Sequence, residues 1–156
     1  MADNDILFDP AFQMKICDWF IARGYKAEAV GTGNHDVYRK KPIYNFEMHT
    51  ALFSDALHPE WVTYYADIQN RLVPDSPTSC KRHFTDEDFY VYITLHEYKH
   101  FSAGGTGVRN LLDRYVFCKA KAKALDWGYI GQQLQALGIA EFEAQAKALS
   151  NALFTD

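Results

Sequence analysis

The stretch DNDILFDPAFQMKICDWF (3–20) decides the fold, because it joins a short strand to a helix. Residues 5–8 (DILF) predict a short buried strand. Asp9 and Pro10 predict a helix start, since an Asp side chain caps free backbone N–H groups and proline fits the first helical position. Gly24 predicts the helix end, because glycine readily adopts a left-handed conformation. The expected apolar face repeats at helical spacing and consists of Phe12, Ile16, Trp19 and Phe20.

The rest of the first third is strand-like. Three stretches predict strands, at about 25–30, 35–40 and 42–49. The link GTGN (31–34) has turn chemistry, and a second turn is marked by Lys40, Lys41 and Pro42. Residues 1–56 therefore predict a small mixed sheet with one helix packed on it.

Residues 57–156 have a helical pattern instead. Thr85 with Asp88 three residues later resembles a capping box and predicts the start of a long helix. VPDSPTS (73–79) predicts a loop. The expected helices are about 59–72, 85–103 and 106–125, followed by two shorter helices split by Gly138. We therefore predict a single α+β domain over 1–156, with a sheet-containing core (1–56) and a helical part (57–156).

The composition excludes several classes of protein. The net charge of -4 argues against general nucleic-acid binding, which needs a basic excess. The start MADNDILFD is not a signal peptide, and no apolar run approaches the roughly 20 residues of a membrane span. We therefore expect a cytoplasmic protein with no membrane partner. The cysteines form neither a CxxC pair nor a disulfide framework; they are Cys17, Cys80 and Cys118.

Three acidic residues form a candidate metal site. Asp3 and Asp5 stand two apart at the start of a strand, so their carboxylates point to the same face. Glu47 lies on a later strand between Phe46 and Met48 and projects away from these apolar neighbours. If the two strands are adjacent, the three carboxylates can hold Mg²⁺, which prefers oxygen ligands. A D-x-D pair near a terminus is also common as plain surface acidity, and this alternative stays open.

Five longer motifs resemble one known family. They lie in order along most of the chain and comprise DNDILFD (3–9), RGY (23–25), NHDVYRKKPIYNFEMH (34–49), EDFYVYITLHEYKHF (87–101) and GTGVRNLLDRYVF (105–117). They resemble the uncharacterised nucleotidyltransferase family of the nucleotidyltransferase superfamily. The resemblance implies a mixed sheet with helices and a helical C-terminal part. It also implies that Asp3, Asp5 and Glu47 match the three metal-binding acids, with Mg²⁺ or Mn²⁺ as cofactor, an NTP as substrate and an unknown small-molecule or protein acceptor.

One element of that superfamily has no counterpart before Asp3. Its members carry a Gly-Ser turn at a helix start, whose backbone amides hold the nucleotide phosphates. We therefore expect either an N-terminally truncated chain or a non-catalytic relative that binds a nucleotide or a partner. A sheet without that segment would expose an edge, which a second copy of the chain would pair with.

HEYKH (96–100) predicts a rival function, because H-E-x-x-H on a helix places two histidines on one face for zinc. Glu97 would then be the general base of a peptidase. The plainer alternative puts His96 at an interface between helix and sheet, with Glu97 and Lys99 more exposed. A third alternative has His96, Lys99 and His100 lining the nucleotide or acceptor cleft.

Two glycine-rich segments have both a structural and a binding interpretation. GGTGVRN (104–110) would bind an anion through its amides and Arg109, or form a tight turn with Thr106 as cap and Arg109 paired to Asp113. GTGNHD (31–36) is typical of a hairpin loop, although its last two residues would also reach a cleft.

Overall fold

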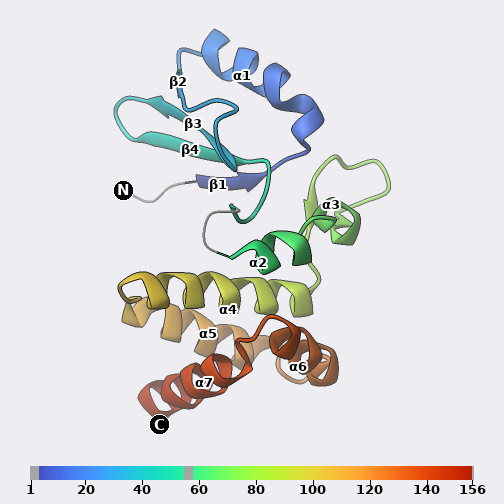
Figure 1. Ribbon diagram of the computed structural model, residues 1–156, viewed down its shortest axis with the longest axis vertical. Helices are drawn as coiled ribbons and strands as arrows, with labels where there is room; N and C mark the ends of the chain where they lie inside the picture. Colours follow the sequence, from blue (N-terminus) through green and yellow to red (C-terminus); the bar gives the residue numbers. More distant parts are fainter. Residues whose placement is uncertain (1–3, 55–57, 156) are drawn as a thin grey trace. The chain divides into compact units, whose positions relative to one another are not determined.

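The computed structural model describes residues 4–54 and 58–155, and the chain divides into two compact units (Figure 1). Unit 1 is Met1–Asn70 and contains a four-stranded sheet. Unit 2 is Arg71–Asp156 and is mainly helical. The predicted α+β class is confirmed. Whether the two units together form the predicted single domain over 1–156 depends on how they join, so this stays a prediction.

The sheet of unit 1 has the strand order β1-β4-β3-β2. Its strands are β1 (Asn4–Leu7), β2 (Lys26–Glu28), β3 (His35–Lys40) and β4 (Tyr44–His49). β1 runs parallel to β4, whereas the β4-β3 and β3-β2 pairs are antiparallel. Figure 1 shows β1 as an edge strand below β4. The prediction of a buried first strand is wrong, because this edge position leaves its first three residues exposed.

The helix after β1 begins where the sequence predicted. The Asp9 side chain accepts a hydrogen bond from the Ala11 backbone N–H at 2.9 Å. A short 3-10 turn, η1 (Pro10–Phe12), then leads into α1 (Gln13–Ala22). Gly24 follows with φ +78°, a conformation that glycine adopts without strain.

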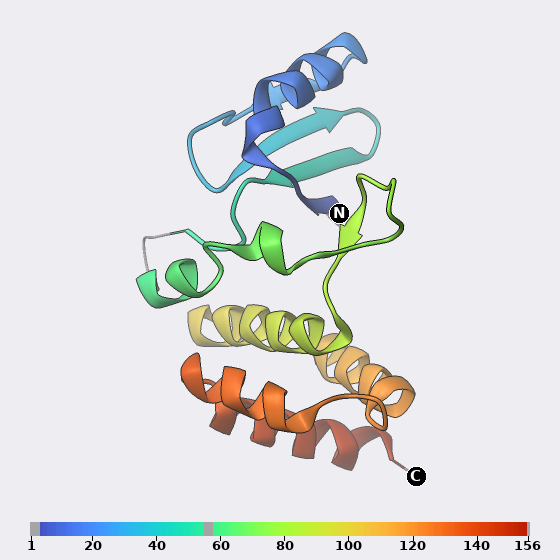
Figure 2. The same ribbon diagram turned by 90° about the vertical axis from the view of Figure 1, so that its right-hand side faces the viewer.

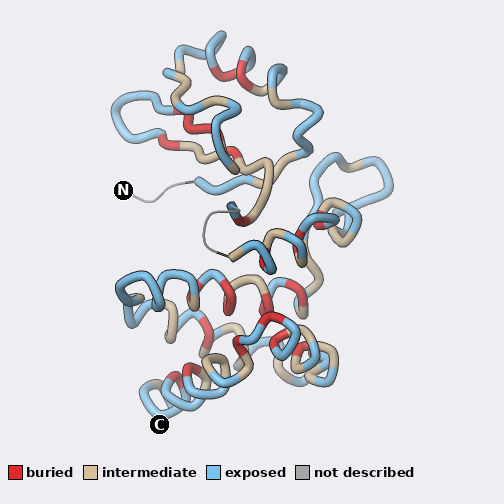
Figure 3. Tube along the Cα trace, in the orientation of Figure 1, coloured by how far each residue is buried: buried red, intermediate tan, exposed pale blue. Residues whose placement is uncertain are grey.

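α1 covers one face of the sheet. Cys17 and Phe20 are buried against Tyr38 of β3 and Met48 of β4, and the Phe20 and Tyr38 rings stack with their centroids 4.2 Å apart. Buried positions on α1 and the strands are red in Figure 3. Half of the Trp19 side chain is exposed, as is that of Phe12, so the predicted apolar face is wrong at these two positions. Side chains on the other face of the sheet point away from α1.

A predicted single helix over 59–72 is two short helices, α2 (Pro59–Tyr64) and α3 (Ile68–Arg71). α2 ends at Tyr65, where the backbone leaves the helical conformation. Trp61 and Tyr65 are buried and pack on Phe53, with ring centroids 5.6 and 5.4 Å from it. This aromatic packing requires a turn that the spacing of apolar residues did not indicate.

Unit 2 begins with a small hairpin that the sequence analysis missed. β5 (Val73–Pro74) pairs with β6 (Arg82–His83), and the first of these strands lies in the predicted loop. The His83 Nδ1 atom lies 2.8 Å from Asp75 Oδ1 and ties the two ends of the loop together. Strands of two residues are too short to show an alternating pattern in the sequence.

The helices of unit 2 follow the predicted order. They are α4 (Asp86–Ala103), α5 (Val108–Lys121), α6 (Trp127–Ala136) and α7 (Ala140–Phe154). The Thr85 hydroxyl accepts the Asp88 backbone N–H at 3.0 Å, so the predicted cap is confirmed. α4 packs on α6, while α5 and α6 pack on α7 (Figure 2). In the described parts of the chain, no helix has both the length and the apolar character needed to cross a membrane.

Candidate active site

Asp5 and Glu47 lie side by side on adjacent strands. In the parallel β1-β4 pair, Asp5 is the register partner of Glu47, and Ile6 is that of Met48. Neighbours across a pair of strands share a face, and successive residues alternate between faces. Met48 belongs to the core beneath α1, so Glu47 and Asp5 project from the opposite face. Asp3, the third predicted acid, lies outside the described residues.

Two histidines share this face. His49 stands two residues after Glu47 on β4, and His35 is its partner across the antiparallel β3-β4 pair. The two imidazole rings have centroids 5.0 Å apart. His49 Nε2 lies 3.1 Å from Asp5 Oδ1, and His35 Nε2 lies 3.7 Å from Glu47 Oε2. The strands thus gather two carboxylates and two imidazoles on the face that α1 leaves open.

The burial of these four side chains differs. The exposed fraction of the side chain is 63% for Asp5 and 35% for His35, but only 22% for Glu47 and 19% for His49. One ligand atom each from His35, Glu47 and His49 lie within 4.8 Å of one another. Among residues 4–54 and 58–155, this is the one such group of three or more His, Cys, Asp or Glu side chains. The site therefore offers oxygen and nitrogen ligands for a cation.

His35 and Asp36 are neighbours at the start of β3, and their side chains lie on opposite faces of the sheet. His35 faces the open side of the sheet, whereas Asp36 is buried on the α1 side. The Asp36 carboxylate accepts hydrogen bonds from Gln13 Nε2 at 3.0 Å and from the Gly31 backbone N–H at 2.8 Å. The hairpin interpretation of GTGNHD (31–36) fits this geometry, and of the two polar residues considered for a cleft only His35 reaches the open face.

His49 was not among the predicted site residues. The signal was present, because residues 47 and 49 alternate with the apolar Met48 and must share a face if the segment is a strand. Pairing His35 with His49 required the register of a hairpin whose turn contains Pro42, and that register cannot be taken from spacing alone.

A comparison with protein families covers nearly the whole chain. The model of a family described as "Uncharacterised nucleotidyltransferase" matches residues 1–155. The chain belongs to this nucleotidyltransferase family. Searches of curated proteins and of solved structures found no match to the chain.

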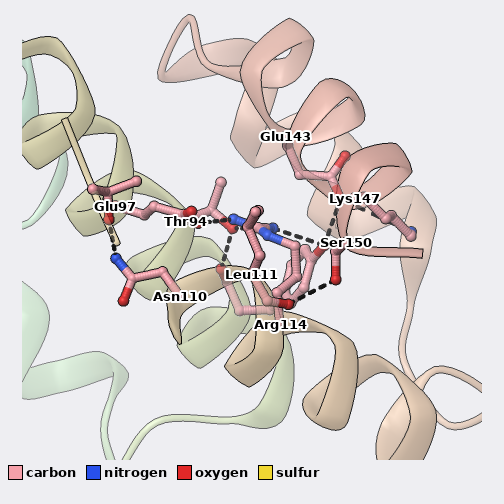
Figure 4. A network of polar contacts seen from close by, with 10 residues as sticks. Thr94, Glu97, Asn110, Leu111, Arg114, Glu143, Lys147 and Ser150 are labelled. Carbon is pink, nitrogen blue, oxygen red and sulfur yellow. Dashed lines mark hydrogen bonds and ion pairs between the residues drawn. The ribbon is translucent and has the colours of Figure 1, made fainter. Parts of the chain in front are cut away.

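In this nucleotidyltransferase-family chain, the glutamate of HEYKH lies inside unit 2. Glu97 Oε2 accepts a hydrogen bond from Arg114 Nη2 at 2.5 Å, and both side chains are buried. Arg114 also donates to Tyr90 and to Thr94, at 3.1 and 3.2 Å (Figure 4). Burial alone would lower the pKa of Arg114, but Tyr90 and Glu97 outweigh it and the pKa is raised. Glu97 is held as a charge partner, and the expectation that it is exposed is wrong.

The histidines of HEYKH lie one turn apart on α4. His96 Nε2 and His100 Nε2 are 3.3 Å apart, and both residues are exposed. The expectation that His96 lies at an interface between helix and sheet concerns two separate units, since α4 belongs to unit 2 and the sheet to unit 1, and it stays a prediction. A catalytic zinc needs a third protein ligand, and the described residues place no third His, Cys, Asp or Glu with this pair.

Lys99 and Arg109 are exposed as well. Arg109 Nε lies 3.9 Å from Asp113 Oδ2, which fits the turn interpretation of GGTGVRN (104–110). Gly107, not Thr106, is the N-cap of α5, and the Thr106 hydroxyl accepts from the Asn110 side chain instead. The predicted roles at a nucleotide stay predictions for His96, Lys99, His100 and Arg109.

Proposed function

We propose that this protein transfers a nucleoside monophosphate from an NTP to the hydroxyl group of an acceptor, with Asp3, Asp5 and Glu47 as ligands of Mg²⁺ or Mn²⁺. Membership of the nucleotidyltransferase family supports the general class of reaction. The observation that carries the proposal further is the register of β1 and β4, which sets Asp5 beside Glu47 on the open face of the sheet.

The chemistry of the side chains fits a divalent cation. Carboxylate oxygens are the usual protein ligands of Mg²⁺, which keeps several waters and takes further oxygens from substrate phosphates. Asp5 is largely exposed, so a phosphate can approach it, while Glu47 is mostly buried and fixed beside it. His49 contacts only one carboxylate oxygen of Asp5, Oδ1, and orients the carboxylate through that contact.

The proposed reaction is an in-line displacement at phosphorus. The acceptor oxygen forms a bond to the α-phosphorus, and the bond from that phosphorus to the oxygen bridging to the β-phosphate breaks. Pyrophosphate leaves with the bonding electron pair, and the hydroxyl proton passes to solvent. A bound divalent cation supplies neutralisation of the phosphate charge. Asp5 and Glu47 would contribute by holding the cation at one fixed place on the sheet.

Metal-dependent binding of NTP tests the proposal. Asp5→Asn and Glu47→Gln each remove one ligand charge, so we expect the Kd for NTP in the presence of Mg²⁺ or Mn²⁺ to rise at least about tenfold. Calorimetric titration with each of the four NTPs measures this, with chelator as the metal-free reference. Asp18→Asn is the matched control, because Asp18 is an exposed acid on α1.

Three results would contradict the proposal. If the Kd for NTP is unchanged in Asp5→Asn and Glu47→Gln, these carboxylates take no part in NTP binding. Stoichiometric zinc that is lost only in His96→Ala favours the peptidase. No binding of any NTP favours a non-catalytic relative that binds a partner. Circular dichroism of each variant shows whether a loss of binding is a loss of fold.

A further inference from the structure

We infer that His35, Glu47 and His49 bind a transition-metal cation, such as Co²⁺ or Zn²⁺, on the open face of the sheet. The inference goes beyond the proposed function, because it assigns two histidine ligands that nucleotidyl transfer does not require. It shares Glu47 with the proposed function, but binding of the cation to this group needs neither nucleotide nor acceptor.

The spacing of the ligand atoms suits a metal ion better than a direct contact. His35 Nε2 and Glu47 Oε2 are 3.7 Å apart, which is too long for a hydrogen bond. Two tetrahedral ligands, each about 2.1 Å from one zinc ion, lie about 3.4 Å from each other. The three ligand atoms lie within 4.8 Å of one another, so small side-chain movements close the group around one cation.

The ring of His35 is already oriented for this role. Its Nδ1 atom lies 3.2 Å from the side-chain oxygen of Asn34, and its Nε2 atom is the one that faces Glu47. A hydrogen bond from Nδ1–H to Asn34 leaves the lone pair of the ring on Nε2. Metal-bound histidines generally donate their second ring N–H to an oxygen acceptor, which fixes the tautomer.

The ring of His49 is also held by a contact of one of its nitrogens. Its Nε2 atom lies 3.1 Å from Asp5 Oδ1, and its Nδ1 atom is buried with no hydrogen-bond partner among the described residues. A buried ring nitrogen without a partner calls for an explanation, because the great majority of buried polar atoms in proteins are hydrogen-bonded. A cation bound at Nδ1 would give His49 the arrangement common to metal-bound imidazoles, with a carboxylate on the other ring nitrogen.

The ligand types predict which cation binds. Imidazole nitrogen suits zinc, copper, iron and nickel, whereas all-oxygen sites suit Mg²⁺ and Ca²⁺. Two imidazoles and one carboxylate therefore favour a transition metal over Mg²⁺. The partial burial of Glu47 and His49 limits competition from water.

Titration with Co²⁺ in the absence of nucleotide tests the inference, because the visible absorption of Co²⁺ changes when protein ligands replace its water shell. We expect one Co²⁺ per chain, not displaced by an equal concentration of Mg²⁺. His35→Ala and His49→Ala should each raise the Kd for Co²⁺ at least about tenfold. His83→Ala is the matched control, because His83 contacts Asp75 and lies outside the group.

The same Kd in His35→Ala, His49→Ala and wild type would overturn the inference, and so would displacement of Co²⁺ by equimolar Mg²⁺. If a histidine variant fails to fold, NMR of the unmodified protein decides the question. Added Co²⁺ should then shift or broaden the ring protons of His35 and His49 and leave those of His83 unchanged. Effects on His83 alone, or on none of the three, would overturn the inference.

The two proposals fail in different ways. If nucleotidyl transfer is wrong and the cation site is right, Glu47→Gln loses Co²⁺ binding with no effect on NTP. If the cation site is wrong and nucleotidyl transfer is right, Glu47→Gln weakens NTP binding, while both histidine variants bind Co²⁺ as the wild type does.

Discussion

A fully buried arginine joins three helices of unit 2. Arg114 on α5 makes an ion pair with Glu97 on α4, and it donates to the hydroxyl of Tyr90. Tyr90 in turn donates to Glu143 on α7 at 2.5 Å. Burial raises the pKa of Tyr90, so this hydroxyl keeps its proton and remains a donor. This chain of contacts gives the glutamate of HEYKH, Glu97, a structural role inside unit 2.

Removing the charge of Glu97 should destabilise the fold. Glu97→Gln leaves the Arg114 guanidinium buried without its counter-charge, and breaking such a pair typically costs about 3–5 kcal/mol. The free energy of unfolding in urea measures this effect. Asp113→Asn is the control, because it changes an exposed acid on the same helix as Arg114 and should stay within about 0.5 kcal/mol. A loss below about 1 kcal/mol for Glu97→Gln would contradict the structural role.

The side chains of a strand alternate between its two faces, and this alternation is what could be used to predict the site. It predicted that Glu47 points away from its apolar neighbours, and the structure shows those neighbours packed in the core beneath α1. It could not assign His49 and His35, because their proximity depends on the register of β3 against β4. It also could not anticipate Glu97, since a helical pattern gives the face of a residue but not the cation that another helix brings to it.

At the scale of elements, Asp36 connects three parts of unit 1. Its carboxylate on β3 accepts from Gln13 at the start of α1, from the Gly31 backbone in the turn and from the Tyr38 hydroxyl at 3.3 Å. α1 is thereby held against the sheet by polar contacts as well as by Phe20. Since α1 covers one face, the site residues are confined to the other.

Asp36→Asn tests this connection. The amide replaces one acceptor oxygen with a donor, so at least one of the three donors loses its partner, at a cost of about 1–3 kcal/mol. Urea unfolding of the variant measures the loss, with Asp18→Asn on the exposed side of α1 as reference. Equal stability of the two variants would show that Asp36 does not hold α1 in place.

The ends of helices were predicted correctly where one capping residue or one glycine sets the boundary. Asp9 and Thr85 cap helices through their side chains, and Gly24 and Gly138 follow helices with positive φ. The β5-β6 hairpin and the break after α2 were missed, because they depend on pairing and aromatic packing rather than on capping residues. β1 is an edge strand of the described sheet, and pairing of this edge with a second copy stays a prediction.

At the scale of the whole molecule, the family assignment covers both units, since the match spans residues 1–155. The order of five motifs along the chain predicted that family, although no single motif is specific. The candidate site belongs to unit 1, while the residues predicted to line a nucleotide cleft belong to unit 2. A cytoplasmic location and the absence of general nucleic-acid binding stay predictions.

The proposed function requires that a metal–nucleotide complex binds at the carboxylates of β1 and β4. Diffraction from crystals soaked with Mn²⁺ and a non-hydrolysable NTP analogue tests it most directly. We predict anomalous density about 2 Å from carboxylate oxygens of Asp5 and Glu47, with the triphosphate beside it. A nucleotide bound elsewhere, with no metal at these two residues, would contradict the account.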